Sequence, residues 1–93
     1  MSEKTAKLIE QGVSILKDAG AREIYLFGSF AAGRATEDSD LDFAVSGLPP
    51  ERFFRTVGEM DEAMKCSFDV IDLDEPTPFV LHLKKEGELK RVG

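Results

Sequence analysis

The spacing of apolar and polar residues predicts alternating helices and strands along the chain. Residues 2–19 carry two interleaved apolar sets at helical spacing, and Gly20 stands where such a helix would end in a left-handed conformation. Residues 23–27 are short, β-branched and aromatic, and they run into Gly28, which is typical of a strand that feeds a turn. Residues 30–32 could then form a short helix.

The middle of the chain predicts a second strand and a second long helix. In residues 41–45 bulky apolar residues alternate with Asp42 and Ala44, as in a strand that buries one face. The Gly-Leu-Pro-Pro sequence at residues 47–50 breaks this strand. Residues 51–65 then present a helical apolar stripe, which is typical of core packing. Its members are Phe53, Val57, Met60 and Met64.

The last third predicts one more strand and one more helix. Residues 68–73 predict the third strand, and Thr77 and Pro78 have the identities of a helix N-cap and a first helical residue. This helix is expected to reach Glu86, and residues 88–92 to add a short edge strand or to fray. The element order predicts an α/β (α+β) fold, in which helices cover one small mixed sheet and the site lies at the strand ends.

Size and charge limit the possible functions. Ninety-three residues suffice for one core, so we expect a single domain over residues 1–93 that is too small for a full dinucleotide-binding fold. The net charge of −6 argues against a free-standing nucleic-acid binder, because phosphate contacts need clustered Lys and Arg. A cation or a basic partner suits this charge better.

The remaining composition indicates an intracellular protein. The single cysteine, Cys66, excludes an internal disulfide and is expected to be a small buried thiol. The N-terminus lacks the apolar stretch of a signal peptide, and no run is long enough to cross a membrane. We therefore expect a cytoplasmic location with no membrane partner.

Two acids at alternate positions of one strand are the most informative feature. Asp40 and Asp42 flank Leu41 and would point to the same face, where their charges repel unless a cation or a proton intervenes. Mg²⁺ suits them, because it takes oxygen ligands and shares its shell with substrate phosphates. A third acid is expected from the next strand. Asp69 is preferred over Asp72, which alternation places on the opposite face.

A glycine turn before these acids suggests phosphate binding. At Gly28 and Ser29 bare backbone N–H groups could approach a phosphate without obstruction, and Ser29 could also cap a following short helix. Ten residues separate Ser29 from Asp40, which is enough for the chain to return and bring the acids beside the turn.

Together these residues resemble the minimal nucleotidyltransferases of the DNA polymerase β superfamily, often encoded as antitoxins beside HEPN-domain toxins. The pattern GSx10DxD is matched by Gly28, Ser29, Asp40 and Asp42, and the later hydrophobic-Asp-hydrophobic triplet by Asp69 with its two neighbours. The resemblance covers almost the whole chain, since members of the family are about this size and share the element order.

The resemblance implies a reaction and a partner. Family members transfer a nucleoside monophosphate from a nucleoside triphosphate to a hydroxyl and release pyrophosphate. Gly28 and Ser29 would bind the triphosphate, Arg34 could reach a phosphate, and Asp40 and Asp42 would hold metal, most simply two Mg²⁺ ions, with Asp69 as the third catalytic acid. In the antitoxin branch ATP would be the substrate, and the acceptor would be a tyrosine of the cognate HEPN toxin, which adenylylation inactivates.

One departure from the family pattern leaves two hypotheses open. Many members read GSxARG, whereas Ala32 takes the place of that arginine here and Arg34 follows the glycine. The first hypothesis is a Mg²⁺-dependent transferase, and the alternative is an antitoxin with a vestigial site that neutralises its toxin by binding. The sequence does not identify the nucleotide, the number of units transferred or the assembly state.

Other conspicuous residues have simpler explanations. His82 has no acid or cysteine at ligand spacing and is expected to be structural. Exposed aromatic residues are candidates for contact with a partner, although core packing would explain them equally well; they are Phe53, Phe54 and Phe79. A basic group near the C-terminus is expected to be solvated surface; it comprises Lys84, Lys85, Lys90 and Arg91.

Overall fold

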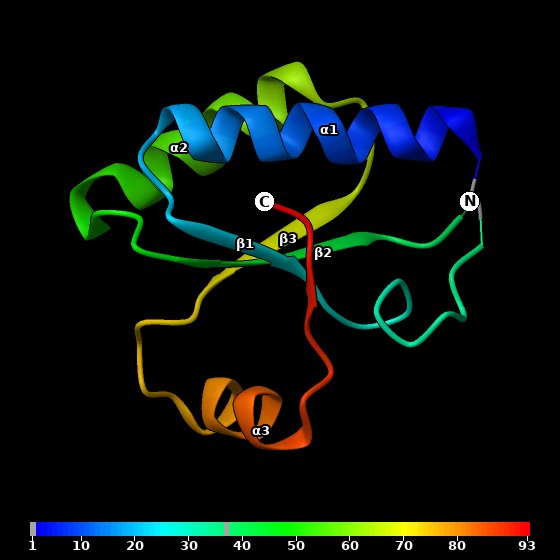
Figure 1. The fold of residues 1–93 in the computed structure, drawn as a ribbon. Coiled ribbons are helices and arrows are strands. Elements are labelled where there is room, and N and C mark those ends of the chain that lie inside the picture. The colour runs from blue at the N-terminus through cyan, green and yellow to red at the C-terminus, as the bar shows by residue number, and fades with distance from the viewer. Residues whose placement is uncertain (1, 37) are drawn as a thin grey trace.

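A computed structural model describes residues 2–36 and 38–93, and it contains the predicted alternation of helices and strands (Figure 1). The elements in chain order are α1 (Glu3–Asp18), β1 (Glu23–Leu26), β2 (Leu41–Ser46), α2 (Pro50–Ala63), β3 (Phe68–Asp72), α3 (Pro78–Glu86) and β4 (Lys90–Arg91). The predicted helices and strands are confirmed to within two residues at their ends. The short helix expected at residues 30–32 is absent, because residues 28–33 form hydrogen-bonded turns instead.

Side-chain caps explain where two of the helices begin. The Ser2 hydroxyl accepts a hydrogen bond from the Thr5 N–H at 3.1 Å, and the Thr77 hydroxyl accepts one from the Val80 N–H at 3.1 Å. Each cap satisfies a backbone donor that has no partner within its helix. Gly87 ends α3 with a φ of 68°, as its position in the sequence predicted.

The four strands form one mixed sheet in the order β3-β2-β1-β4. β1 pairs antiparallel with β2 and β4, whereas β2 and β3 are parallel and are joined by α2. The strand expected near the C-terminus is therefore present as β4, on the edge opposite β3. The mixed sheet covered by helices confirms the predicted fold class.

Helices cover both faces of this sheet (Figure 1). α1 and α2 lie on one face, where Phe43 and Val45 are completely buried against residues such as Leu16 and Met60. α3 lies on the other face, where Val80 packs in a smaller cluster that includes Ala44. The alternation within β2 thus sends its bulky residues toward α1 and α2, and Asp42 toward the face that carries α3. No helix of the described residues is long and apolar enough to cross a membrane.

Candidate active site

The turn that follows β1 lies directly against Asp42. The Phe27 N–H donates a hydrogen bond to the carbonyl oxygen of Asp42 at 2.9 Å, which places the end of β1 beside the start of β2. Gly28 follows with a φ of +70°, and a Cβ at this position would lie 2.5 Å from Oδ2 of Asp42. Only glycine fits here, because a side chain would be strained and would also clash with the carboxylate. The sequence prediction that turn and acids are adjacent agrees with this contact.

The turn itself is closed by backbone hydrogen bonds. The Ala32 N–H donates to the Gly28 carbonyl at 3.1 Å, and the Arg34 N–H donates to the Ser29 carbonyl at 2.9 Å. Ser29 is partly buried, and Arg34 is exposed just beyond the turn. Ser29 therefore caps no helix, contrary to one of the two roles considered for it, whereas its use as a phosphate ligand stays a prediction.

The sheet brings Asp42 and Asp69 together. These residues are opposite each other in the parallel pairing of β2 and β3, so their side chains leave the sheet on the same face. Asp40 precedes β2 by one residue, and alternation gives it the same direction as Asp42. All three acids lie at the amino-terminal ends of β2 and β3, beside the end of β1.

Electrostatic repulsion is concentrated on Asp42. Partial burial raises the pKa of the Asp42 carboxyl above its ordinary value, and the negative charges of Asp69 and then Asp40 raise it further. Among the described residues no side chain or backbone group donates a hydrogen bond to this carboxylate that would offset the repulsion. Asp42 is thus a partly buried acid whose charge only a cation or a proton would relieve.

Asp72 has a different environment from Asp69. It pairs with Val45, whose side chain lies in the core beneath α1 and α2, so Asp72 leaves the sheet on the face away from Asp42. Its Oδ1 atom accepts a hydrogen bond from the Asp74 N–H at 2.9 Å, which closes the bend after β3. The opposite faces predicted for these two acids are therefore observed, and the geometry favours Asp69 as the third acid.

The three carboxylates suit Mg²⁺, although their oxygen atoms do not converge on one point. Three carboxylates on one face provide the oxygen ligands that this ion prefers, and the glycine turn lies directly against one of them, Asp42. Within residues 2–36 and 38–93, no three acidic, His or Cys side chains lie close enough to hold one ion as they stand. Asp40 and Asp69 are exposed, so their side chains are free to change rotamer.

Cys66 lies nearer this site than the sequence suggested. The expectation of a buried thiol is wrong, because Cys66 is half-buried in the loop before β3. Partial burial raises the pKa of this thiol, and the negative charge of Asp40 raises it further. The thiol therefore stays protonated and is not an activated nucleophile.

Sequence reasoning missed the role of Asp74. Its carboxylate accepts hydrogen bonds from the Gly47 N–H at 2.8 Å and from the Ser46 hydroxyl at 3.0 Å, which ties the end of β2 to the loop after β3. The backbone hydrogen bond from Gly47 is the main reason why the pKa of Asp74 lies below its ordinary value. Spacing gave no signal for this contact, since the two segments are far apart in sequence.

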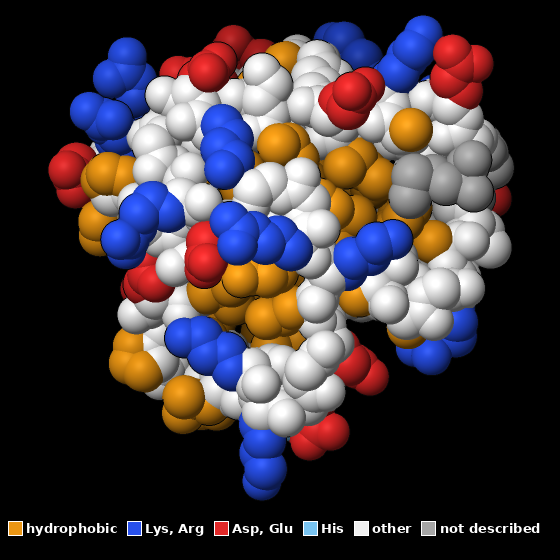
Figure 2. Space-filling view, viewed as in Figure 1, with side chains coloured by type: hydrophobic (Ala, Val, Ile, Leu, Met, Phe, Trp, Pro, Cys, Tyr) orange, Lys and Arg blue, Asp and Glu red, His pale blue; other side chains and the backbone are white. Residues whose placement is uncertain are grey.

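The remaining candidate residues lie on the surface. His82, Lys84 and Lys85 are exposed on α3, and Lys90 and Arg91 are exposed on β4. Arg91 forms an ion pair with Glu23 on the neighbouring strand β1, with 3.4 Å between Nη1 and Oε2. Figure 2 shows Lys and Arg side chains spread over the face that carries the C-terminus, with acidic and apolar side chains between them. This pattern is that of a mixed solvated surface.

The sequence profile of the family described as Polymerase beta, Nucleotidyltransferase matches residues 10–89, and the chain belongs to this family. The matched range contains the glycine turn and all three acids. No functionally curated protein matches the chain at a significant level.

Solved structures of small nucleotidyltransferases have the same fold. A toxin–antitoxin complex with AMP-PNP is 25% identical, with a TM-score of 0.66 over 88% of this chain and 69% of that chain. A putative minimal nucleotidyltransferase is 23% identical, with a TM-score of 0.67 over 100% of this chain and 96% of that chain. A complex of a tri-AMPylated Shewanella oneidensis HEPN toxin with an MNT antitoxin is 22% identical, with a TM-score of 0.64 over 92% and 69% of the two chains.

Proposed function

We propose that this nucleotidyltransferase transfers AMP from ATP to a tyrosine of a cognate HEPN toxin and thereby acts as its antitoxin. The observation that carries the proposal is the contact of Gly28 with the Asp42 carboxylate, while Asp69 lies opposite Asp42 on the next strand. A turn of bare backbone and a group of acids thus adjoin each other. The AMP-PNP-bound toxin–antitoxin complex and the AMPylated HEPN toxin support the choice of nucleotide and acceptor.

Each site residue has a distinct role in this proposal. Backbone N–H groups of the turn at Gly28 and Ser29 would orient the triphosphate, and Arg34 would reach it from beyond the turn. Asp40 and Asp42 would hold Mg²⁺, with Asp69 completing the ligands. Bound Mg²⁺ would neutralise charge on the triphosphate and on the leaving pyrophosphate.

The transfer itself exchanges one bond at phosphorus for another. The tyrosine oxygen bonds to the α-phosphorus of ATP as the bond to pyrophosphate breaks, and pyrophosphate leaves. The tyrosine proton moves to a carboxylate, for which Asp69 is the candidate because it is exposed on β3, opposite Asp42. A docked partner would also exclude water and so limit hydrolysis of ATP.

Label transfer tests this function. The purified protein is incubated with α-labelled ATP, Mg²⁺ and the HEPN protein from the adjacent reading frame, and the labelled species is identified by electrophoresis. We expect label on the partner with the wild type and a loss of at least about a hundredfold with Asp42→Asn, as is typical for loss of a principal catalytic group. No transfer by the wild type, or equal transfer by Asp42→Asn, would contradict the proposal.

A second function is neutralisation by binding alone. It is favoured by Ala32 in place of the usual arginine, and by the open arrangement of the three acids in the described structure. This alternative predicts that growth rescue survives the double change Asp40→Asn and Asp42→Asn. Loss of rescue while the complex still forms would reject it.

A further inference from the structure

The outer edge of β3 has free backbone hydrogen-bonding groups. β3 lies at the end of the sheet and pairs only with β2 among the described strands. The Leu41 N–H donates to the Ser67 carbonyl, and the Leu73 N–H donates to the Val45 carbonyl. In a parallel ladder bounded by these two bonds, the even-numbered residues of β3 direct their N–H and C=O groups outward. These residues are Phe68, Val70 and Asp72. The Asp72 carbonyl already accepts a hydrogen bond from the Glu75 N–H at 3.3 Å, so at Asp72 only the N–H is left for a partner.

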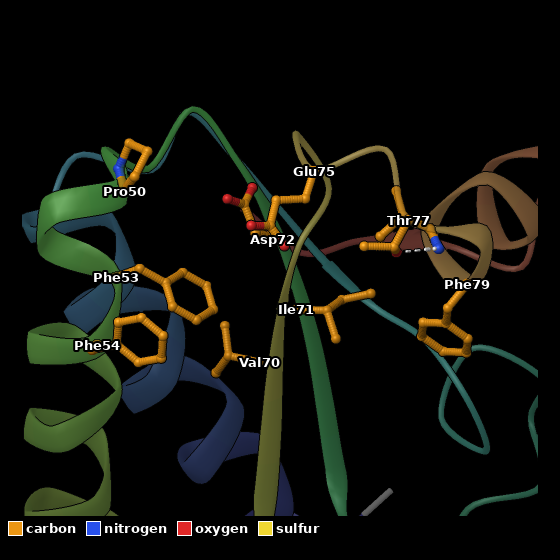
Figure 3. Close-up of a pocket in the computed structure, with 10 residues that line it drawn as sticks. Pro50, Phe53, Phe54, Val70, Ile71, Asp72, Glu75, Thr77 and Phe79 are labelled. Atoms are coloured by element: carbon orange, nitrogen blue, oxygen red, sulfur yellow. Dashed lines mark hydrogen bonds between the residues drawn. The ribbon is translucent and has the colours of Figure 1, made fainter.

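Two adjoining hollows follow this edge and form one groove, which we call the β3 groove. The first, of about 310 Å³, lies between Phe53 and Phe54 of α2 and Phe79 of α3, and it reaches around the strand from Val70 to Ile71 (Figure 3). The second, of about 730 Å³, continues along α2 toward the start of β3. Phe53, Phe54 and Val70 line both hollows, so the groove runs the whole length of β3.

Exposed aromatic rings form the walls of this groove. Phe54 is 84% exposed and Phe79 is 50% exposed, although both lie within helices. Each ring contacts a partly or fully buried aromatic residue edge to face, Phe54 with Phe53 at 5.6 Å and Phe79 with Phe27 at 5.9 Å between centroids. The rings are therefore held in place and offer apolar area that no described residue covers.

The charge of the groove indicates what binds in it. Every charged residue that lines the two hollows is acidic, and these residues are Asp61, Asp69, Asp72 and Glu75. A second copy of the chain is disfavoured as the occupant, because antiparallel pairing of β3 with itself would place the same acids of both copies along one seam. A partner with alternating apolar and basic side chains would complement both the aromatic walls and the carboxylates.

We propose that the β3 groove binds an extended, basic segment of a partner polypeptide as an added strand. Backbone groups of the segment pair with Phe68, Val70 and Asp72, its apolar side chains enter the aromatic hollows, and its Lys or Arg side chains face the carboxylates. Because Asp69 lines the groove, the segment passes beside the proposed transfer site. The identification of the partner as the acceptor protein rests on the proposed function, whereas the groove and its chemistry do not.

Peptide binding followed by NMR tests the proposal. The ¹⁵N-labelled protein without ATP is titrated with acetyl-(Val-Lys)₄-amide, and acetyl-(Val-Glu)₄-amide serves as the charge-reversed control. We expect saturable shifts at Phe54 and Phe79 and slower amide exchange at the outward-facing Phe68, Val70 and Asp72. The amides of Asp69 and Ile71, which already bond to β2, should gain little protection. The acidic peptide should bind at least about tenfold more weakly.

Surface variants locate the binding site without disturbing the core. Phe54→Ser should weaken binding of the basic peptide roughly tenfold, whereas Leu81→Ser, which removes a 56% exposed side chain of α3 outside the groove, should leave it unchanged. Glu75→Lys should also weaken binding, and Glu86→Lys at the end of α3 is its matched control.

Four results would overturn the proposal: no saturable shift, equal binding of both peptides, even protection of all β3 amides, or a Phe54-dependent dimer of the protein alone. The last result would assign the groove to a second copy. Because peptide binding is measured without ATP, its failure would leave the proposed transfer reaction standing. Conversely, a failed transfer assay with intact peptide binding would remove the reaction and keep the groove.

Discussion

At the scale of single residues, the site depends on Asp42, whose surroundings disfavour the charged form of its carboxylate. The Asp42 carboxylate is partly buried, contacts the turn at Gly28 and feels the charges of Asp69 and Asp40. Within residues 2–36 and 38–93, the Asp42 carboxylate accepts no hydrogen bond that would explain it as structural. A protein gains nothing in stability from such a cluster, which is why it indicates a function.

Asp42→Asn should therefore stabilise the protein in the absence of divalent cations. In a chelator we expect a gain of up to about 1 kcal/mol in the free energy of unfolding, because solvent screens much of the repulsion at this partly exposed group. Added Mg²⁺ should raise the melting temperature of the wild type more than that of the variant, since binding stabilises the native state. Thermal unfolding with and without Mg²⁺ measures both effects, and Glu10→Gln on the exposed surface of α1 is the control. A less stable variant in chelator, or an equal response to Mg²⁺, would count against the metal site.

Asp74 shows the opposite behaviour, because hydrogen bonds stabilise its charged form. We expect Asp74→Asn to lose about 1 kcal/mol of stability at pH 7, an amount typical of hydrogen bonds to an exposed carboxylate after screening. The pKa of Asp74 is lowered in the folded state, so this stability is fully present above the ordinary carboxyl pKa, about 3.9. This contribution to stability is lost as the pH falls further, through the lowered pKa of Asp74 in the folded state.

Urea unfolding between pH 7 and acid pH tests this dependence. The difference between wild type and Asp74→Asn should stay constant down to about pH 4 and should shrink below it. If the difference in unfolding free energy persists unchanged in acid, the negative charge of Asp74 is not the cause of its contribution to stability.

At the scale of elements, two glycines in helices have opposite roles. A Cβ on Gly12 of α1 would lie 2.6 Å from Cζ of Phe43, whereas a Cβ on Gly58 of α2 would meet no atom within 4 Å. Gly12 therefore lets α1 approach the sheet over β2, the strand that carries Asp42. Gly58 has no such role in this structure.

The same substitution should thus change stability in opposite directions. Gly58→Ala should stabilise the protein by about 0.5–1 kcal/mol through helix propensity. Gly12→Ala has the same propensity gain but should be destabilising overall, because overpacking the core costs about 1–3 kcal/mol. Chemical denaturation of the two variants checks the contrast. Stabilisation by both would show that α1 can move away from Phe43 without cost.

The elements themselves were largely predictable from local signals. The cap at Thr77 and the helical stripe that includes Met60 depend on neighbours in sequence, and the structure confirms them. The turn at Gly28 and Ser29 was predictable, but the short helix predicted at residues 30–32 is wrong, because the backbone bonds that continue the turn to residue 33 are not visible in the sequence. The half-buried state of Cys66 depends on how a loop packs, which spacing does not reveal.

At the scale of the whole molecule, the sheet topology makes the site. The strand order sets β2 between β1 and β3, so the glycine turn after β1 and the acid of β3 both adjoin Asp42. The spacing of motifs in the sequence anticipated this meeting, but it could not reveal the open edge of β3 or the exposure of Phe54. Those features depend on which strand ends the sheet, and long-range pairing decides this.

The whole-molecule arrangement also fits the proposed role of a partner. The described residues place the glycine turn, the acids and a groove beside Asp69 together, with no deep enclosure around them. A docked polypeptide would contribute both the acceptor hydroxyl and the missing wall. Catalysis and partner binding are therefore expected to depend on adjoining surfaces, with Asp42 at one and Phe54 at the other.

The most direct test of the central claim is the mass of the partner after co-expression. A HEPN protein, taken from the adjacent reading frame where one is encoded there, is co-expressed with the wild type or with Asp42→Asn, purified, and analysed as intact protein and as peptides by mass spectrometry. The account predicts one or more adenylyl groups on a tyrosine with the wild type, and an unmodified partner, still in complex, with the variant. An unmodified partner in both cases, or equal modification in both, would contradict it.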